Sequence, residues 1–245
     1  MTLRKLWLFS VILVTMTTGV SNSSFSDDSD AYLKQRLKMV QEQIANPIDG
    51  REPVSNERVL KALAEVPRHL FVPQDVRDMA YADRPLPIGH GQTISQPYIV
   101  ASMTELLAPK AEHVVLEVGT GSGYQAAVLS RLVKHVYSIE IVRPLAEQAR
   151  DYLLAHGFKN VTVKAGDGYA GWPEHAPFDG IIVTAAPDHV PEPLIEQLRP
   201  GGRMVIPVGE RYAVQELMLL TKREDGTINE ERVMSVGFVP LTRDQ

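Results

Sequence analysis

The chain of 245 residues contains no cysteine. Disulfide bonds, thiolate nucleophiles and cysteine-ligated metal sites are therefore excluded, and cysteine usage gives no information about the redox compartment. The chain also lacks an excess of basic residues, because 25 Lys and Arg stand against 30 Asp and Glu, and its formal charge is −5. A nucleic-acid substrate is not expected, since proteins that bind the phosphate backbone carry clustered positive charge.

Metal-ligand spacing is absent as well. The seven histidines are scattered along the chain, so we expect no metal site. Hydrophobic residues make up 44% of the chain and charged residues 22%, values that exclude a disordered, collagen-like or coiled-coil protein. Nothing in the sequence specifies an oligomeric state, and we assume a monomer.

No apolar run is long enough for a confident membrane span, although one lies in a leader at the N-terminus. The run Leu6–Val14 follows Arg4 and Lys5 and precedes small and polar residues up to Ser24. This order is typical of a secretory signal, but the cleavage pattern is poor. An uncleaved anchor and a start codon assigned too far upstream are the alternatives. We separate a signal-like leader and linker, residues 1–30, from a single domain, residues 31–245.

The periodicity of apolar residues predicts helices at the start of the domain. Apolar residues recur at helical spacing over Leu33–Ile44 and Val59–Val66, and Ile99–Leu107 also reads as a helix. The stretch Pro67–Pro97 is rich in proline and glycine, which predicts a long irregular segment that carries function. We expect residues 31–110 to form the substrate side of the domain.

After Lys110 short apolar runs alternate with helical segments. This alternation predicts βαβ units and a parallel sheet in residues 111–245. The predicted strands are His113–Val118, Val136–Ile141, Val161–Lys164, Phe178–Thr184 and Arg203–Val208. The predicted helices are Tyr124–Val133, Pro144–His156 and Pro191–Leu198, and the expected terminal antiparallel pair is Gln215–Thr221 and Val233–Phe238. The fold class is therefore α/β, a doubly wound, mostly parallel sheet with an antiparallel terminal strand and added N-terminal helices.

A glycine-rich turn joins the first predicted strand to the next helix, where open α/β sheets bind ligands. Gly119, Gly121 and Gly123 allow the backbone to bend sharply and to approach a ligand. The dinucleotide fingerprint needs a further glycine where Tyr124 stands, which counts against a bound pyrophosphate. Glu140 ends the next strand, at the sequence spacing from Gly119 that is typical of an acidic residue accepting hydrogen bonds from ribose hydroxyls. A nucleoside cofactor such as S-adenosylmethionine fits; a ligand-free turn and a solvated carboxylate are the alternatives.

Two further strand ends belong to the same rim of the sheet. Asp167 and Gly168 follow the third strand, where a carboxylate and an amide could contact adenine, and an Asx turn is the alternative. Thr184–Pro187 follows the fourth strand and lacks the Asp/Asn-Pro-Pro-aromatic pattern of amino-directed methyltransferases. A base-amine acceptor is therefore disfavoured.

Several segments resemble known methyltransferases. Val115–Tyr124 and Leu198–Arg203 resemble the class I S-adenosylmethionine-dependent methyltransferases in general. More specific segments resemble the protein-L-isoaspartate O-methyltransferase family, and these are Pro67–Pro73, Tyr81–Asp83, Gly91–Pro97 and Val236–Thr242. The resemblance covers Leu33–Thr242, essentially the whole domain.

The resemblance implies a Rossmann-like methyltransferase fold and S-adenosyl-L-methionine as cofactor. It implies methyl transfer to the free α-carboxylate of L-isoaspartyl residues in damaged proteins and peptides, a protein-repair reaction. Ser95 is the implied catalytic hydroxyl, and Thr242 is expected to close the pocket. The residues that we expect to bind the cofactor are Ile94, Gln96, Pro97, Glu117, Gly119, Gly121, Gly123, Glu140, Asp167, Gly168 and Thr242.

This reaction needs no general base, because a carboxylate with a pKa of about 4 is ionised at neutral pH. An anion and a cation give neutral products, so a water-poor pocket and in-line alignment favour the transition state. The Ser95 hydroxyl can orient the carboxylate without the ground-state stabilisation that an arginine would add. An N-cap of the following helix, or a solvated loop residue, is the alternative for Ser95. His69 and His90 are expected to be structural.

Other functions and other locations stay open. A methyltransferase for another small carboxylate or amine, a nicotinamide-dependent oxidoreductase and an inactive cofactor-binding scaffold are the rivals. S-adenosylmethionine is made inside the cell and, being charged, does not cross a bilayer freely. We therefore expect the protein in the cytoplasm, with periplasmic export or an inner-membrane anchor through residues 1–24 as the alternative. Membrane contact is expected only through the leader.

Overall fold

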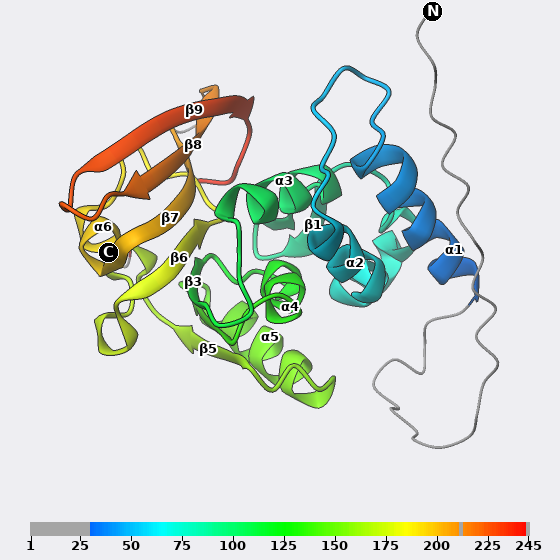
Figure 1. The fold of residues 1–245 in the computed structure, drawn as a ribbon. Coiled ribbons are helices and arrows are strands. Elements are labelled where there is room, and N and C mark those ends of the chain that lie inside the picture. The colour runs from blue at the N-terminus through cyan, green and yellow to red at the C-terminus, as the bar shows by residue number, and fades with distance from the viewer. Residues whose placement is uncertain (1–29, 211–212, 244–245) are drawn as a thin grey trace, which may run out of the picture.

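A computed structural model describes residues 30–210 and 213–243 (Figure 1). The signal-like sequence at the N-terminus lies outside the described residues. Within the described ranges, no helix combines the length and the apolar character that crossing a membrane requires.

A seven-stranded sheet forms the centre of the molecule, in the order β5-β4-β3-β6-β7-β8-β9. The strands are β3 (Val114–Val118), β4 (His135–Glu140), β5 (Val161–Ala165), β6 (Phe178–Val183), β7 (Leu198–Val208), β8 (Gln215–Lys222) and β9 (Ile228–Val236). The first five strands in spatial order run parallel. β8 runs antiparallel to β7, and β9 runs antiparallel to β8. The predicted α/β class with a terminal antiparallel pair is confirmed.

Two strands begin earlier than their sequence pattern predicts. β7 starts at Leu198, which pairs with Phe178 of β6, rather than at Arg203. The register then shifts before Arg203 pairs with Gly180, and Gly201 within this irregular stretch has φ of 76°. β9 starts at Ile228, and its exposed, charged first half carries no apolar alternation. An edge strand that faces solvent lacks the pattern from which strands are predicted.

Helices pack on both faces of the sheet, which makes it doubly wound. Leu116 and Val118 belong to one apolar cluster, whereas Val115 between them belongs to the other. This division follows from the alternation of side chains along a strand. On one face α3 (Pro97–Leu107), α4 (Tyr124–Ser130) and α5 (Arg143–Ala155) pack against the strands. On the other face α6 (Glu192–Gln197) packs against β7.

The N-terminal residues form a separate helical layer beside α3. α1 (Asp30–Lys38) runs into a π-helical turn at Met39–Ile44, and α2 (Glu57–Glu65) follows, so both predicted helices are confirmed. In Figure 1 this layer, drawn blue and cyan, stands on the opposite side of the molecule from β8 and β9. α2 contacts both α3 and α4, which fixes the layer to the sheet through them.

The prediction that Pro67–Pro97 is wholly irregular is wrong. This segment contains two 3₁₀ turns, Arg68–Phe71 and Gln74–Met79, and a hairpin of β1 (Leu86–Gly89) and β2 (Gln92–Ile94). The strands were missed because each is very short and the turn between them is rich in glycine, where His90 also adopts a positive φ of 52°. The hairpin ends at Ile94 and leads directly into Ser95 and Gln96, the two residues that precede α3.

Candidate functional site

The turn after β3 depends on its glycines. Gly119, Gly121 and Gly123 have φ of 97°, 52° and 86°, a region that other residues avoid. A Cβ atom at Gly119 would lie 2.5 Å from the Thr184 hydroxyl oxygen, and one at Gly121 would lie 3.3 Å from Ile88. The Thr184 hydroxyl donates a hydrogen bond of 2.6 Å to the Gly119 carbonyl. The turn is therefore pressed against β6, and its backbone is bare where a ligand could approach.

Glu140, at the end of β4, fixes this turn. Its Oε2 accepts a hydrogen bond of 2.7 Å from the Gly121 N–H, and its Oε1 accepts one of 2.9 Å from the Val142 N–H. Glu140 as a whole residue is 6% exposed. Each carboxylate oxygen has further lone pairs, so both can still accept a hydrogen bond from a ligand hydroxyl.

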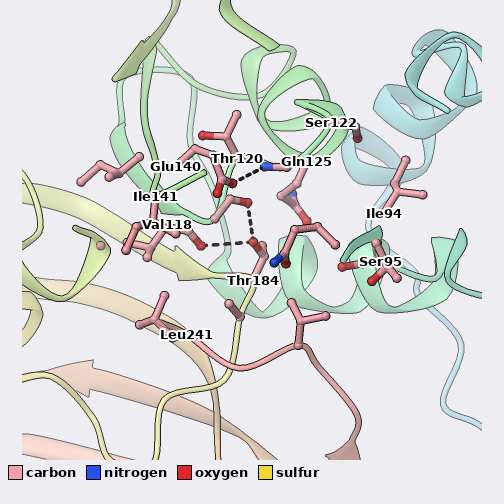
Figure 2. A pocket seen from close by; sticks show the side chains of 18 of the residues that line it. Ile94, Ser95, Val118, Thr120, Ser122, Gln125, Glu140, Ile141, Thr184 and Leu241 are labelled. Atoms are coloured by element: carbon pink, nitrogen blue, oxygen red, sulfur yellow. Dashed lines mark hydrogen bonds between the residues drawn. The ribbon is translucent and has the colours of Figure 1, made fainter. Parts of the chain in front are cut away.

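A pocket opens at the carboxyl ends of β3, β4 and β6, between the glycine turn and the segment before α3. Figure 2 shows Ile94 and Ser95 on one side of it and Val118, Glu140 and Ile141 on the other. The wall contains seven of the twelve residues expected in the site: Ile94, Ser95, Gly119, Gly121, Glu140, Gly168 and Thr242.

The remaining expected residues lie around the pocket rather than in its wall. Gln96 lines a neighbouring pocket, and Pro97 is the buried first residue of α3. Gly123 is the N-cap of α4 and packs against α5, where a Cβ atom would lie 3.1 Å from Leu153. The Asp167 carboxylate accepts a hydrogen bond of 2.9 Å from the Tyr169 N–H, which is the Asx turn weighed as its alternative.

Glu117 is fully buried and reaches the pocket only through two hydroxyl groups. The Ser138 hydroxyl donates a hydrogen bond of 2.5 Å to Glu117 Oε2 and lies 2.5 Å from the Thr120 hydroxyl, and Thr120 lines the pocket. Glu117 Oε1 has no hydrogen-bond partner among the described residues. Burial raises the pKa of Glu117 to about 8, against the lowering effect of the Ser138 hydrogen bond.

The sequence reasoning missed several wall residues. Thr120 and Gln125 belong to the turn and to α4, Ile141 follows Glu140, and Thr184 follows β6. The rule that identified Glu140 also placed Thr184 at this edge of the sheet, but Thr184 was not assigned to the site. Gln125, whose amide donates to the Thr104 hydroxyl at 3.0 Å, has no such signal.

A second pocket adjoins the first and shares part of its wall. The shared residues are Thr93, Ser95, Thr184 and Val239. The rest of the second wall consists of Pro85, Gln96, Ile99 and residues 235–238. Ser95 therefore lies at the junction, and no hydrogen bond joins its hydroxyl to another described residue. It is not the N-cap of α3, since that position belongs to Gln96.

Comparison with known proteins finds a family model and many relatives that match this chain. Residues 38–245 match the family model of protein-L-isoaspartate(D-aspartate) O-methyltransferase (PCMT). Protein-L-isoaspartate O-methyltransferase 2 of Polaromonas sp. (strain JS666 / ATCC BAA-500) is 59% identical over 191 residues, which are 78% of this chain and 90% of the relative. The enzyme of the same name from Syntrophobacter fumaroxidans is 52% identical over 236 residues, 95% of this chain and 94% of the relative.

Solved structures of similar proteins share the fold. A protein-L-isoaspartate O-methyltransferase superposes with a TM-score of 0.74 at 30% identity, covering 85% of this chain and 65% of that one. A Plasmodium falciparum protein described as a putative protein-L-isoaspartate O-methyltransferase, in complex with S-adenosyl-L-homocysteine, superposes with a TM-score of 0.72 at 24% identity. It covers 85% of this chain and 99% of that one.

Proposed function

This chain belongs to the protein-L-isoaspartate(D-aspartate) O-methyltransferase family, and from that premise we propose how its own residues carry the reaction. The enzyme transfers a methyl group from S-adenosylmethionine to the free α-carboxylate of L-isoaspartyl residues, a step in the repair of damaged proteins and peptides. Family membership sets aside the oxidoreductase, the inactive scaffold and the other acceptors.

The first pocket fits the nucleoside part of S-adenosylmethionine. The bare backbone of the glycine turn allows close approach, and both Glu140 oxygens can accept from ribose hydroxyls. A Cβ atom at Gly168 would lie 2.4 Å from the Val118 side chain of β3, so glycine is required at this position of the wall. We assign the ribose to Glu140 and the adenine to the part of the wall formed by Gly168 and Leu241. When bound, the cofactor supplies an electrophilic methyl group on a sulfonium.

The second pocket is the proposed site of the isoaspartyl residue. The observation that carries this proposal is the junction of the two pockets at Ser95, with a hydroxyl that is free of hydrogen bonds to other described residues. This hydroxyl can donate to one oxygen of the acceptor carboxylate and leave the other oxygen to attack. The serine thus orients the nucleophile, and no proton has to be removed from it.

The acceptor pocket also fits a reaction in which opposite charges disappear. No charged side chain of the described residues lines it; apolar residues such as Ile99 and Phe238 share the wall with uncharged polar ones such as Gln96. A wall without charged groups favours a transition state with less charge than the separated ions. No basic side chain of this described wall can form an ion pair with the acceptor carboxylate, which would stabilise the reactants more than the transition state.

Replacing Ser95 by alanine tests the assignment. We expect turnover on an isoaspartyl peptide to fall roughly 10- to 100-fold, the value of a hydrogen bond to a charged group, with the affinity for S-adenosylhomocysteine unchanged. The measurement is the formation of base-labile methyl ester on matched isoaspartyl and aspartyl peptides, and only the isoaspartyl peptide should be labelled.

The matched control is Ser235→Ala, since Ser235 lines the same pocket but its hydroxyl donates to Glu216 at 3.1 Å. It should keep wild-type turnover. Full activity of Ser95→Ala would leave Ser95 without a chemical role, and a loss of S-adenosylhomocysteine affinity with an intact fold would move it to the nucleoside side.

We further propose that the enzyme acts in the cytoplasm. The reason is the supply of S-adenosylmethionine, a charged nucleoside that does not cross a bilayer freely. Cell fractionation with N-terminal sequencing of the full-length product tests this location. A mature chain that begins between Val20 and Ala31 in the periplasmic fraction would overturn it.

A further inference from the structure

The Asp83 carboxylate contacts three residues from two other segments of the chain. Its Oδ1 accepts a hydrogen bond of 2.9 Å from the Tyr98 N–H, and its Oδ2 accepts one of 2.8 Å from the Gln96 side chain. The same Oδ2 forms an ion pair of 2.7 Å with Arg51, and the Asp83 side chain is 13% exposed. Asp83 itself comes from the chain between the second 3₁₀ turn and β1, so it joins regions far apart in the sequence.

These contacts make up for a cap that α3 lacks. The N-cap residue Gln96 forms no side-chain hydrogen bond to the helix, and the first helical residue, Pro97, has no N–H to donate. Tyr98 is therefore the first residue of α3 whose N–H needs an acceptor, and Asp83 supplies it from another segment. The negative charge at this position also opposes the positive end of the helix dipole.

Ser95 sits between this cap and the hairpin. On one side Ile94 of β2 pairs with Leu86 of β1, and on the other Asp83 accepts hydrogen bonds from Gln96 and Tyr98. The Ser95 hydroxyl has no hydrogen bond to another described residue, so only its backbone fixes where it points. The position of the hydroxyl at the junction of the pockets thus depends on the two anchors beside it.

We propose that Asp83 is a positioning residue for methyl transfer, acting through the segment that carries Ser95. The inference rests on the proposed role of Ser95. A displacement of a reacting group by about 1 Å can cost up to roughly 100-fold in rate, so loosening one anchor should be visible in turnover.

The second partner of Arg51 offers a matched control. Arg51 stacks 4.1 Å over the Tyr98 ring and pairs with Asp49 as well as Asp83. The Asp49 side chain is 52% exposed, and its hydrogen bonds are to Arg51 rather than to any residue from 94 to 98. Asp49→Asn removes a carboxylate from the same ion-pair cluster without touching the segment of Ser95.

Asp83→Asn should lower kcat for an isoaspartyl peptide about tenfold, with KM and the affinity for S-adenosylhomocysteine nearly unchanged. Asp49→Asn should keep the wild-type kcat. Asp83 also interacts electrostatically with the fully buried Arg68. Burial lowers the pKa of Arg68 to about 10, whereas the nearby Tyr124 and Asp83 act to raise it. Asp83→Asn removes this compensating charge, so the variant could fail to fold. Asp83→Glu covers that outcome, because it keeps the charge and moves the carboxylate by one methylene. It should fold with wild-type stability and still show the reduced kcat.

A wild-type kcat in Asp83→Glu would mean that only the charge matters, which overturns the inference. The double variant Asp83→Asn/Ser95→Ala tests the route. If Asp83 acts through Ser95, it should turn over no more slowly than Ser95→Ala, and additive losses would overturn the inference. Two results separate this inference from the function proposed for Ser95. A fully active Ser95→Ala removes the role of Ser95 itself, whereas a slow Ser95→Ala beside a wild-type Asp83→Asn removes only the role of Asp83.

Discussion

Glu140 holds the glycine turn with the same two oxygens that are proposed to receive the ribose. Glutamine at this position would present an amide group to either the Gly121 or the Val142 N–H, so one donor would face another donor. The substitution thus disturbs the turn as well as the charge of the acceptor. Cofactor affinity should report both effects.

We expect Glu140→Gln to weaken the binding of S-adenosylhomocysteine by about 1 to 3 kcal/mol, the range for hydrogen bonds to charged groups. Calorimetric titration measures this change. Glu147→Gln is the control, because Glu147 is an exposed residue of α5 away from the pocket wall. Equal affinities of the two variants would remove Glu140 from the cofactor site.

The buried Glu117 should give the enzyme a pH-dependent stability. Its pKa is about 8 in the folded protein and 4.5 when unperturbed, so between these values the folded state binds more protons than the unfolded state. The free energy of unfolding should therefore fall as pH rises through this window, by at most about 1.4 kcal/mol per pH unit. Below pH 4.5 both states are protonated and the contribution is constant.

Glu117→Gln, which cannot ionise, should lose this slope. Urea denaturation at intervals from pH 5 to pH 8 should show the variant gaining stability over the wild type as pH rises. All other groups titrate in both proteins, so the difference reports Glu117 alone. Parallel pH profiles would show that Glu117 stays ionised in the folded protein.

At the scale of elements, the turn between β3 and α4 is fixed by its contact with the end of β6. Gly119→Ala should place a methyl group against Thr184 and force a positive φ on alanine. We expect a loss of roughly 1 to 3 kcal/mol in stability, together with weaker cofactor binding. Gly226→Ala is the control, since Gly226 has φ 85° and nothing within 4 Å of its Cβ position. If thermal unfolding shows the same loss of stability in both variants, the contact with Thr184 adds no cost beyond that of the positive φ.

The sequence predicted those elements whose local pattern matches their burial. β3 and β6 are apolar apart from one acidic residue each, Glu117 and Asp179, because they are buried on both faces. Glu140 could be located because strand ends in a parallel sheet share one edge. The β1-β2 hairpin is too short to show periodicity, and the first half of β9 faces solvent. The contacts of Asp83 with Gln96, Tyr98 and Arg51 join distant segments, and no local pattern encodes such contacts.

For the whole molecule, the division between leader and domain makes a direct prediction. The core as described begins in α1 and its π-helical turn, where Met39 and Ile44 are fully buried. A chain that starts at Asp30 should therefore fold and keep the wild-type kcat and S-adenosylhomocysteine affinity. A chain that starts at Ala45 should unfold at a lower temperature, because it loses both buried side chains. Loss of folding in the longer chain would place part of the domain before Asp30.

The two adjoining pockets also imply that both substrates are bound at the same time during a catalytic cycle. Each pocket keeps residues of its own, such as Glu140 on one side and Phe238 on the other, so nucleoside and peptide can be bound together. The methyl group then passes directly between two bound molecules, and the enzyme itself is never methylated as an intermediate. Double-reciprocal plots of initial rate at several fixed peptide concentrations should give lines that intersect. Parallel lines would mean that the first product leaves before the second substrate binds, and would contradict direct transfer.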